Sequence, residues 1–230
     1  MARISAHRAG GDTRPGETVE PNSLDAIAAA VELGTDLVEI DVHLHAGAAR
    51  LGHDQVDDTS PALAEALAAL GDRAALHLDL KCADRDAVIV GQAVAALGAG
   101  RVVVTTNLDA DVRRLRAWAV EHAPGLLVGL STSAPPPGHG LRARLVSWFP
   151  RTRMRRSGTD LVVSHHVLAR WWLARWAHRR GLPLLVWTVD EDRDLIRWLR
   201  DPRTTIVTTN RPARALDLRS RVTQCPPASR

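Results

Sequence analysis

The feature that most constrains the fold of this chain is a regular alternation of short β-branched or aliphatic runs with longer stretches of helical spacing. Eight runs have the length and composition of buried strands, at residues 3–8, 37–42, 75–80, 102–106, 126–131, 161–164, 184–188 and 206–209. Helical stretches separate most of them, at residues 23–33, 61–70, 84–97, 110–122, 166–180 and 191–200. This alternation is typical of a parallel sheet covered by helices.

Eight such units within 230 residues, 45% of them hydrophobic, favour one closed barrel over an open sheet. We therefore predict an α/β protein with a (β/α)8 (TIM) barrel as its single domain, spanning residues 1–218. Residues 219–230 end in a segment that contains Pro and Ser, and we expect a flexible C-terminal tail there.

Polar residues stand where the first three predicted strands end, which is the end of a TIM barrel that carries its chemistry. His7 and Arg8 end the first strand, and Glu39 and Asp41 end the second. The third ends with the sequence His-Leu-Asp-Leu-Lys at residues 77–81, so that its polar residues share one face. These side chains are expected to meet at the mouth of the barrel.

Three carboxylates, those of Glu39, Asp41 and Asp79, would repel one another at this mouth unless a cation lay between them. Ligation by oxygen atoms alone suits a hard ion such as Mg²⁺ or Ca²⁺. We expect a divalent metal to bind here. The alternative is that Glu39 and Asp41 pair with arginines.

Two histidines, His7 and His53, can flank the same mouth, because His53 lies in the loop after the second strand. Imidazoles have an ordinary pKa near neutrality and suit the roles of general acid and general base. A single histidine is more often structural. The interpretation depends on the convergence of acid, base, carboxylates, Arg and Lys, a set that phosphodiester cleavage can use. His43 and His77 are expected to support this site rather than to react.

Seven short motifs lie on these elements in a fixed order: His7-Arg8, Glu20-Pro21-Asn22-Ser23, Glu39-Ile40-Asp41-Val42, His53-Asp54, Asp79-Leu80-Lys81, Val186-Trp187-Thr188-Val189 and Thr209-Asn210-Arg211-Pro212. With them the chain resembles the glycerophosphodiester phosphodiesterase family, which belongs to the phospholipase C-like phosphodiesterases. The resemblance spans nearly the whole predicted barrel.

The resemblance implies a role for each matched side chain. Glu39, Asp41 and Asp79 would bind the metal, with Asn22 supporting them from a neighbouring loop. His7 and His53 would be catalytic, and the substrate would be bound by Arg8, Lys81 and Trp187. It also implies the reaction, which is metal-dependent hydrolysis of a glycerophosphodiester to glycerol 3-phosphate and an alcohol.

The chain departs from the family pattern in four places. It has Glu20-Pro21-Asn22 where the family has Pro-Glu-Asn, Asp79 where Glu is more frequent, and Asn210 in place of an Asp. Only 25 residues separate His53 from Asp79, so the usual inserted subdomain after the second strand is shortened. These departures keep two alternatives open: a phospholipase D-like cleavage of lysophospholipid or sphingolipid, and a catalytically silent barrel that binds phosphate or a membrane.

Charge is unevenly distributed along the sequence. Residues 1–110 carry 8 basic and 17 acidic side chains, whereas residues 111–230 carry 22 and 9. Lys81 is the single lysine among 30 basic residues, and an ammonium and a guanidinium are not interchangeable in a tight site. The basic half suits a substrate that bears phosphate or an anionic membrane surface.

Trp148, Trp171, Trp172 and Trp176 lie near arginines, which fits either core packing or contact with a membrane interface. No nucleic-acid-binding motif accompanies these arginines, so we expect no nucleic-acid partner. The N-terminus lacks the apolar core of a signal peptide, and no window is apolar enough to cross a membrane, so we expect a cytoplasmic protein. The oligomeric state stays open.

Overall fold

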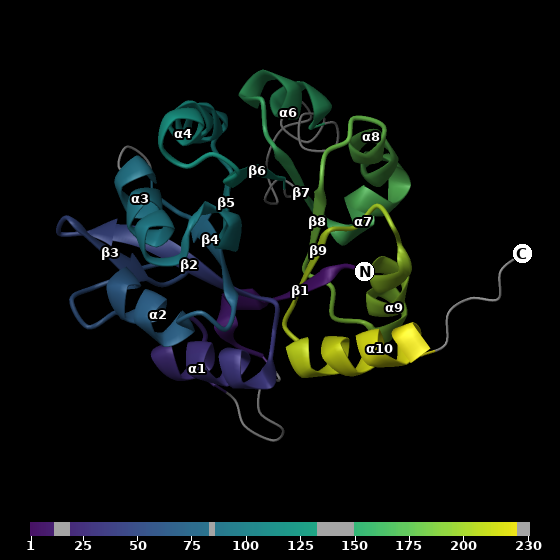
Figure 1. Cartoon of the computed structure of the whole chain (residues 1–230), viewed down its shortest axis with the longest axis horizontal. Helices are drawn as coiled ribbons and strands as arrows, with labels where there is room; N and C mark the ends of the chain where they lie inside the picture. The colour runs from purple at the N-terminus through teal and green to yellow at the C-terminus, as the bar shows by residue number, and fades with distance from the viewer. Residues whose placement is uncertain (12–18, 83–85, 133–149, 225–230) are drawn as a thin grey trace, which may run out of the picture.

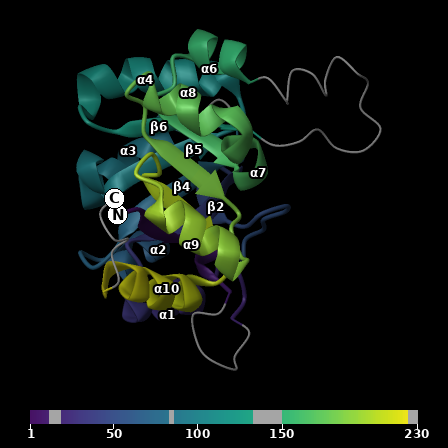
Figure 2. The same cartoon turned by 90° about the vertical axis from the view of Figure 1, so that its right-hand side faces the viewer.

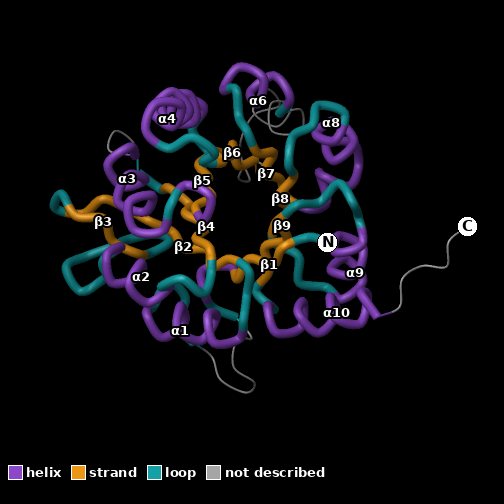
Figure 3. The backbone as a smooth tube through the Cα atoms, in the orientation of Figure 1, coloured by secondary structure: helices purple, strands orange, loops and turns teal. Residues whose placement is uncertain are grey.

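The computed structural model describes residues 1–11, 19–82, 86–132 and 150–224. Eight parallel strands form a closed barrel, because β1 (Arg3–Ala6) pairs with both β2 and β9. The other barrel strands are β2 (Leu37–His45), β4 (Ala75–Leu80), β5 (Val102–Thr106), β6 (Leu127–Thr132), β7 (Leu161–His165), β8 (Leu184–Trp187) and β9 (Ile206–Thr209). They form the inner ring of Figure 3. The predicted (β/α)8 barrel is confirmed.

Helices form the outer ring (Figure 1). They are η1 (His7–Ala9), α1 (Leu24–Leu33), α2 (Leu63–Leu70), α3 (Asp86–Leu97), η2 (Ala99–Arg101), α4 (Asp109–His122), α6 (Arg151–Ser157), α7 (His166–Leu168), η3 (Ala169–Leu173), α8 (Ala174–His178), α9 (Asp192–Arg200) and α10 (Pro212–Gln224). The sequence did not predict α6 and α10. No helix in the described ranges is both long and apolar enough to cross a bilayer.

Helix α10 corrects the predicted boundary of the C-terminal tail. The helix continues past residue 219 to Gln224, and it lies between α1 and α9 around the barrel (Figure 1). Leu218 and Val222, four residues apart, are both buried, and Arg219 forms an ion pair with Asp36. Residues 219–224 therefore belong to the barrel. The rest of the predicted tail lies outside the described residues.

A strand that the sequence did not predict follows β2. Strand β3 (Ala48–Leu51) pairs antiparallel with the end of β2 through the turn at Ala46 and Gly47. Both turn residues have positive φ, at 48° and 84°, as a type I′ hairpin requires. The hairpin lengthens β2 beyond the predicted residue 42. Beyond it, the short connection from His53 to β4 holds a single helix, α2.

The interior of the barrel changes from apolar to polar along the strands. Its lower part is a cluster of inward-facing side chains from six strands: Leu37, Ala75, Val103, Leu161, Val163, Leu185 and Ile206. Two residues further along β2 and β4, the inward positions are Glu39 and His77, which are paired in register. In the side view the strand arrows point toward the end where α7 begins (Figure 2). The polar end is therefore the carboxyl-terminal mouth.

Candidate active site

A cavity of about 370 Å³ opens at the carboxyl-terminal mouth of the barrel. It brings together eight of the nine side chains singled out in the sequence, namely His7, Arg8, Glu39, Asp41, His53, Asp79, Lys81 and Trp187. Asn22 lies behind this cavity, against Asp41. The arrangement follows from the period-two alternation of the strands, which turns every second residue toward the barrel axis.

The three acids converge as the sequence predicted. Each of Glu39, Asp41 and Asp79 offers a carboxylate oxygen, and these oxygens all lie within 4.8 Å of one another. Asp41 and Asp79 are direct partners in the parallel pairing of β2 and β4. Glu39 and Asp41 are buried, with 3% and 1% of their surface exposed.

Glu39 shows the electrostatic strain of this cluster. Burial raises the pKa of Glu39 well above its ordinary value, and the charges of Asp41 and Asp79 raise it further. The backbone N–H of Arg8 donates a hydrogen bond to Glu39 Oε2 at 2.5 Å. Arg8 has a φ of 54°, and this left-handed turn at the end of β1 aims its N–H at Glu39. The backbone of this turn therefore supports a buried acid.

Lys81 lies against the other two acids. Its Nζ is 3.0 Å from Asp41 Oδ1 and 2.6 Å from Asp79 Oδ2. Burial lowers the pKa of Lys81, but the two carboxylates outweigh burial and raise it above its ordinary value. For Asp41, burial raises the pKa, while Lys81, Asn22 and Arg8 together lower it more. The guanidinium of Arg8 approaches Asp41 at 3.4 Å, so the arginine pairing considered from the sequence exists for Asp41.

Asn22 holds Asp41 through two reciprocal hydrogen bonds. Its Nδ2 donates to Asp41 Oδ2 at 3.0 Å, and the backbone N–H of Asp41 donates to its Oδ1 at 2.9 Å. Asn22 is 5% exposed and has a φ of 60°, a conformation that asparagine tolerates better than most residues. The sequence Glu20-Pro21-Asn22 thus still delivers its asparagine to the acid cluster.

His7 is held by a relay that the sequence did not identify. Asn210 Nδ2 donates to Asp190 Oδ2 at 2.8 Å, which leaves Asn210 Oδ1 as the acceptor for His7 Nδ1 at 2.7 Å. His7 Nδ1 therefore carries the proton, and the lone pair is on Nε2. Burial lowers the pKa of His7, and the hydrogen bond to Asn210 offsets only part of this effect. Asp190 follows the motif at residues 186–189, but nothing in that motif marks it.

His53 lies at the outer edge of the cavity, and its own neighbour holds it. Its Nδ1 is 2.5 Å from Asp54 Oδ1, which leaves Nε2 free to face the mouth. The backbone oxygen of His53 accepts a hydrogen bond from His43 Nε2 at 3.0 Å. His43 therefore supports the loop that carries His53, in keeping with its expected supporting role.

His77 is buried below the acids and contributes to the lining of the cavity. Ser5 Oγ lies 3.2 Å from its Nδ1, and Thr105 Oγ1 lies 3.1 Å from its Nε2. Thr105 in turn donates to Asp79 Oδ1 at 2.6 Å. Burial lowers the pKa of His77 to about 4, so the ring is neutral at pH 7. Sequence reasoning missed Thr105, which supports Asp79 from the neighbouring strand.

The part of the cavity lining that comes from β6, β8 and β9 is uncharged. It includes Trp187 and Thr188 from the end of β8, Ser131 from β6 and Thr208 from β9. The indole Nε1 of Trp187 and the hydroxyl of Thr208 are buried, and neither has a hydrogen-bond partner among the described residues. This part of the lining is therefore polar but carries no charge.

The acid cluster has the donor set of a hard divalent cation. Its ligand atoms are three carboxylate oxygens that lie within 4.8 Å of one another, and such hard oxygen donors suit Mg²⁺ and Ca²⁺. Burial is the main cause of the raised pKa of Glu39, and the charges of Asp41 and Asp79 add to it more than Lys81 relieves. The residues present therefore fit Mg²⁺ or Ca²⁺.

The chain is thus a (β/α)8 barrel that gathers carboxylates, imidazoles and cationic side chains at one mouth. Neither a protein-family model nor a curated protein matches the sequence. Solved structures do match. A glycerophosphodiester phosphodiesterase from Parabacteroides distasonis is 19% identical, with a TM-score of 0.72 and coverage of 96% of this chain and 98% of its own.

Two further structures are similar to this chain. An Oleispira antarctica phosphodiesterase, solved in complex with the product sn-glycerol-3-phosphate, is 16% identical, with a TM-score of 0.70 and coverage of 95% of this chain and 96% of its own. A glycerophosphodiester phosphodiesterase from Agrobacterium tumefaciens is 18% identical, with a TM-score of 0.68 and coverage of 94% and 100%. At these identities the likeness establishes a shared barrel fold.

Proposed function

We propose that the chain is a glycerophosphodiester phosphodiesterase that hydrolyses its substrate to glycerol 3-phosphate and an alcohol. The observation that carries the proposal is the single cavity that holds the acid cluster, both histidines, Arg8 and Lys81. The resemblance of seven motifs and the shared fold of solved phosphodiesterases support it.

In this proposal Glu39, Asp41 and Asp79 bind a divalent cation. When bound, such a cation supplies positive charge that stabilises the phosphoryl oxygens in the transition state. Arg8 and Lys81 bind the same oxygens from the protein side. Trp187 positions the alcohol part of the substrate on the uncharged part of the lining.

His7 is the general base in this proposal. Its Nε2 lone pair is free, and its lowered pKa keeps the ring neutral at pH 7. It takes the proton of a glycerol hydroxyl as that oxygen attacks phosphorus. The bond from phosphorus to the other alcohol breaks, and the leaving oxygen takes a proton from His53 Nε2. Water then opens the cyclic phosphate with the two histidines in exchanged roles, which restores both.

The test is hydrolysis of a small glycerophosphodiester, followed by detection of glycerol 3-phosphate. We expect activity with Mg²⁺ or Ca²⁺, loss with a chelator, and recovery when metal is added back. His7→Ala and His53→Ala are each expected to abolish turnover while the fold and the metal-induced stabilisation persist. Full activity in the two histidine variants would refute the acid and base assignment.

A second candidate is phospholipase D-like cleavage of a lysophospholipid or sphingolipid by the same residues. Two observations favour it: the third acid is Asp79, and the connection from His53 to β4 holds a single helix in place of an inserted subdomain. Release of the head-group alcohol from a lysolipid, with glycerophosphodiesters left intact, would select this candidate. A chain that binds phosphate and hydrolyses neither substrate would be the silent barrel.

A further inference from the structure

One apolar feature of the surface is left unexplained by the proposed site. Trp171, in the segment η3, is 76% exposed, and Val167, in α7, is 45% exposed. Arg170 and Arg175 are exposed beside them, and Arg151 lies on the neighbouring helix α6. We call these five residues the Trp171 patch.

The local backbone keeps Trp171 on the surface. Segment η3 is a turn of π-helix between α7 and α8. Such wide turns change the register of a helix face and occur frequently at functional sites. Ala169 and Leu173 point into the core, whereas Trp172 is partly buried beneath Arg151, whose guanidinium carbon is 4.8 Å from the ring centre. The core packing considered from the sequence thus holds for Trp172 and leaves Trp171 outside.

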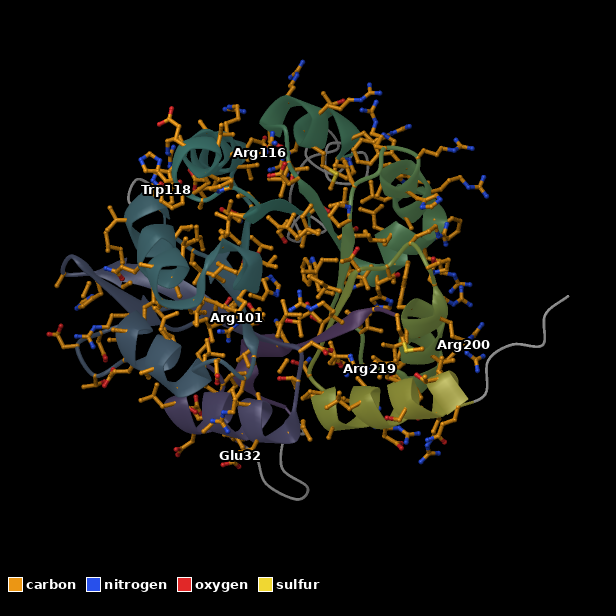
Figure 4. All side chains as sticks on the ribbon, viewed as in Figure 1. Glu32, Arg101, Arg116, Trp118, Arg200 and Arg219 are labelled. Atoms are coloured by element: carbon orange, nitrogen blue, oxygen red, sulfur yellow. The ribbon has the colours of Figure 1, made fainter. Side chains whose placement is uncertain are left out.

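The surroundings of the patch are strongly basic. Residues 150–182 contain eight arginines and one acid, Asp160. Seven of the arginines are exposed, and among the residues that the structure describes none of these seven forms an ion pair with a carboxylate. Figure 4 shows side chains tipped with nitrogen projecting outward around α6 and α8. The charge is therefore available to an anionic partner.

The patch lies beside the mouth of the barrel. Helix α7 begins at His166, directly after β7 ends at the mouth (Figure 2). The ring of His165 is in edge contact with that of Trp187, which lines the cavity, at 5.8 Å between centres. Trp171 follows His165 by about one and a half helical turns, or roughly 9 Å. Trp171 therefore lies in the outer ring of helices, near the end of the barrel that carries the cavity.

We propose that the Trp171 patch docks the protein on a bilayer that contains anionic phospholipid. Exposed indole side chains favour the interfacial region of a membrane, and arginines are attracted to its negative surface potential. A nucleic acid would match the charge but leaves no role for Val167 and Trp171. A second copy of the chain, joined through this patch, would place arginines against arginines. The substrate part of the inference rests on the proposed function: docking would present a diester in the membrane to the cavity.

The first test is sedimentation of the full chain with vesicles of phosphatidylcholine alone or with phosphatidylglycerol. We expect binding to the anionic vesicles only, weakened by salt. Trp171→Ala is expected to weaken partition by roughly tenfold, and Arg170→Gln and Arg175→Gln by roughly fivefold each. Val120→Ala and Arg200→Gln are matched controls, because these residues are exposed on α4 and α9, and both should bind like the wild type.

Three results would overturn the proposal. The first is equal binding of Trp171→Ala and Val120→Ala to the anionic vesicles, or no binding by the wild type. The second is binding of a duplex oligonucleotide, in the absence of vesicle binding, that requires the arginines but not Trp171. The third is self-association in gel filtration that Trp171→Ala removes.

The second test compares two substrates. Trp171→Ala should lower hydrolysis of a lysophospholipid carried in anionic vesicles and leave that of a soluble glycerophosphodiester unchanged. If both rates fall together, Trp171 acts on the cavity and the docking proposal is wrong. If the wild type hydrolyses neither substrate yet sediments with the vesicles, the proposed function fails and docking stands.

Discussion

Replacing Glu39 with glutamine separates the energetic penalty of a buried charge from its use as a metal ligand. Glutamine keeps an oxygen that accepts the Arg8 N–H, and it removes the ionisable group. Two unit charges 4.8 Å apart repel by about 3.5 kcal/mol at an effective dielectric constant of about 20. Lys81 offsets part of this repulsion, so we expect Glu39→Gln to stabilise the metal-free protein at pH 8 by about 2–3 kcal/mol.

The effect of Glu39 on the free energy of unfolding also depends on pH. The folded pKa of Glu39 lies above its unfolded value of 4.5, so the folded metal-free protein retains a proton that the unfolded chain releases. Glu39 therefore makes the metal-free protein less stable as pH rises from 4.5 through the folded pKa, by at most about 1.4 kcal/mol per pH unit. The glutamine variant lacks this slope. It also loses one metal ligand.

The assay is urea unfolding between pH 5 and 8, with chelator or with Mg²⁺. Metal at about 100 times its Kd should stabilise the wild type by about 2.7 kcal/mol, and most of this gain should be absent in Glu39→Gln. Glu121→Gln, an exposed change on α4, is the control and should behave like the wild type. A metal-free Glu39→Gln protein that is less stable than the wild type at pH 8, or one that keeps the whole gain from Mg²⁺, would refute the reasoning.

Three further predictions follow from the same structure. Asn22→Ala removes two buried hydrogen bonds and should lower the free energy of unfolding in urea by about 2–4 kcal/mol. Calorimetry should show metal affinity about 10- to 100-fold weaker. Unchanged metal affinity would contradict the support that Asn22 gives to Asp41. Asp190→Ala frees Asn210 to rotate and should lower kcat by about 10- to 100-fold, while the metal-induced rise in Tm persists. Gly129→Ala places a Cβ 2.5 Å from Val163 Cγ2 and should destabilise by about 1–3 kcal/mol, whereas Gly91→Ala in α3 meets only ordinary contacts and should stabilise by about 1 kcal/mol.

The sequence predicted those parts of the fold and site that depend on local pattern. The buried runs gave all eight barrel strands, and period-two alternation placed Glu39 and Asp41 on one face. The sequence did not identify Thr105, because its role depends on the register between strands. It reaches Asp79 because the two residues are direct partners in the pairing of β4 and β5. Asp190 escaped for a similar reason, since it acts through Asn210, which directly follows strand β9.

The missed elements have physical explanations as well. Strand β3 is short and carries an exposed residue, so its pairing with β2 comes from the turn at Ala46 and Gly47 rather than from its own hydrophobic pattern. Helix α10 begins at Pro212, a good first residue of a helix, but the Pro and Ser content of the final segment suggested a tail from residue 219 onward. Its burial against the barrel is a tertiary effect that overrides that composition.

The interior of the barrel shows how the chain accommodates a shorter third acid. The Thr105 hydroxyl donates its proton to Asp79, so its oxygen must accept from His77 Nε2–H. The Nδ1 of His77 is then the acceptor for the Ser5 hydroxyl. Each proton in this series of hydrogen bonds therefore has a single position. This order requires a neutral ring, which the pKa of about 4 ensures at pH 7. Asp79 is thus held on one side by the hydrogen bonds through Thr105, His77 and Ser5, and on the other by its ion pair with Lys81. These contacts, rather than the length of its side chain, fix the position of its carboxylate.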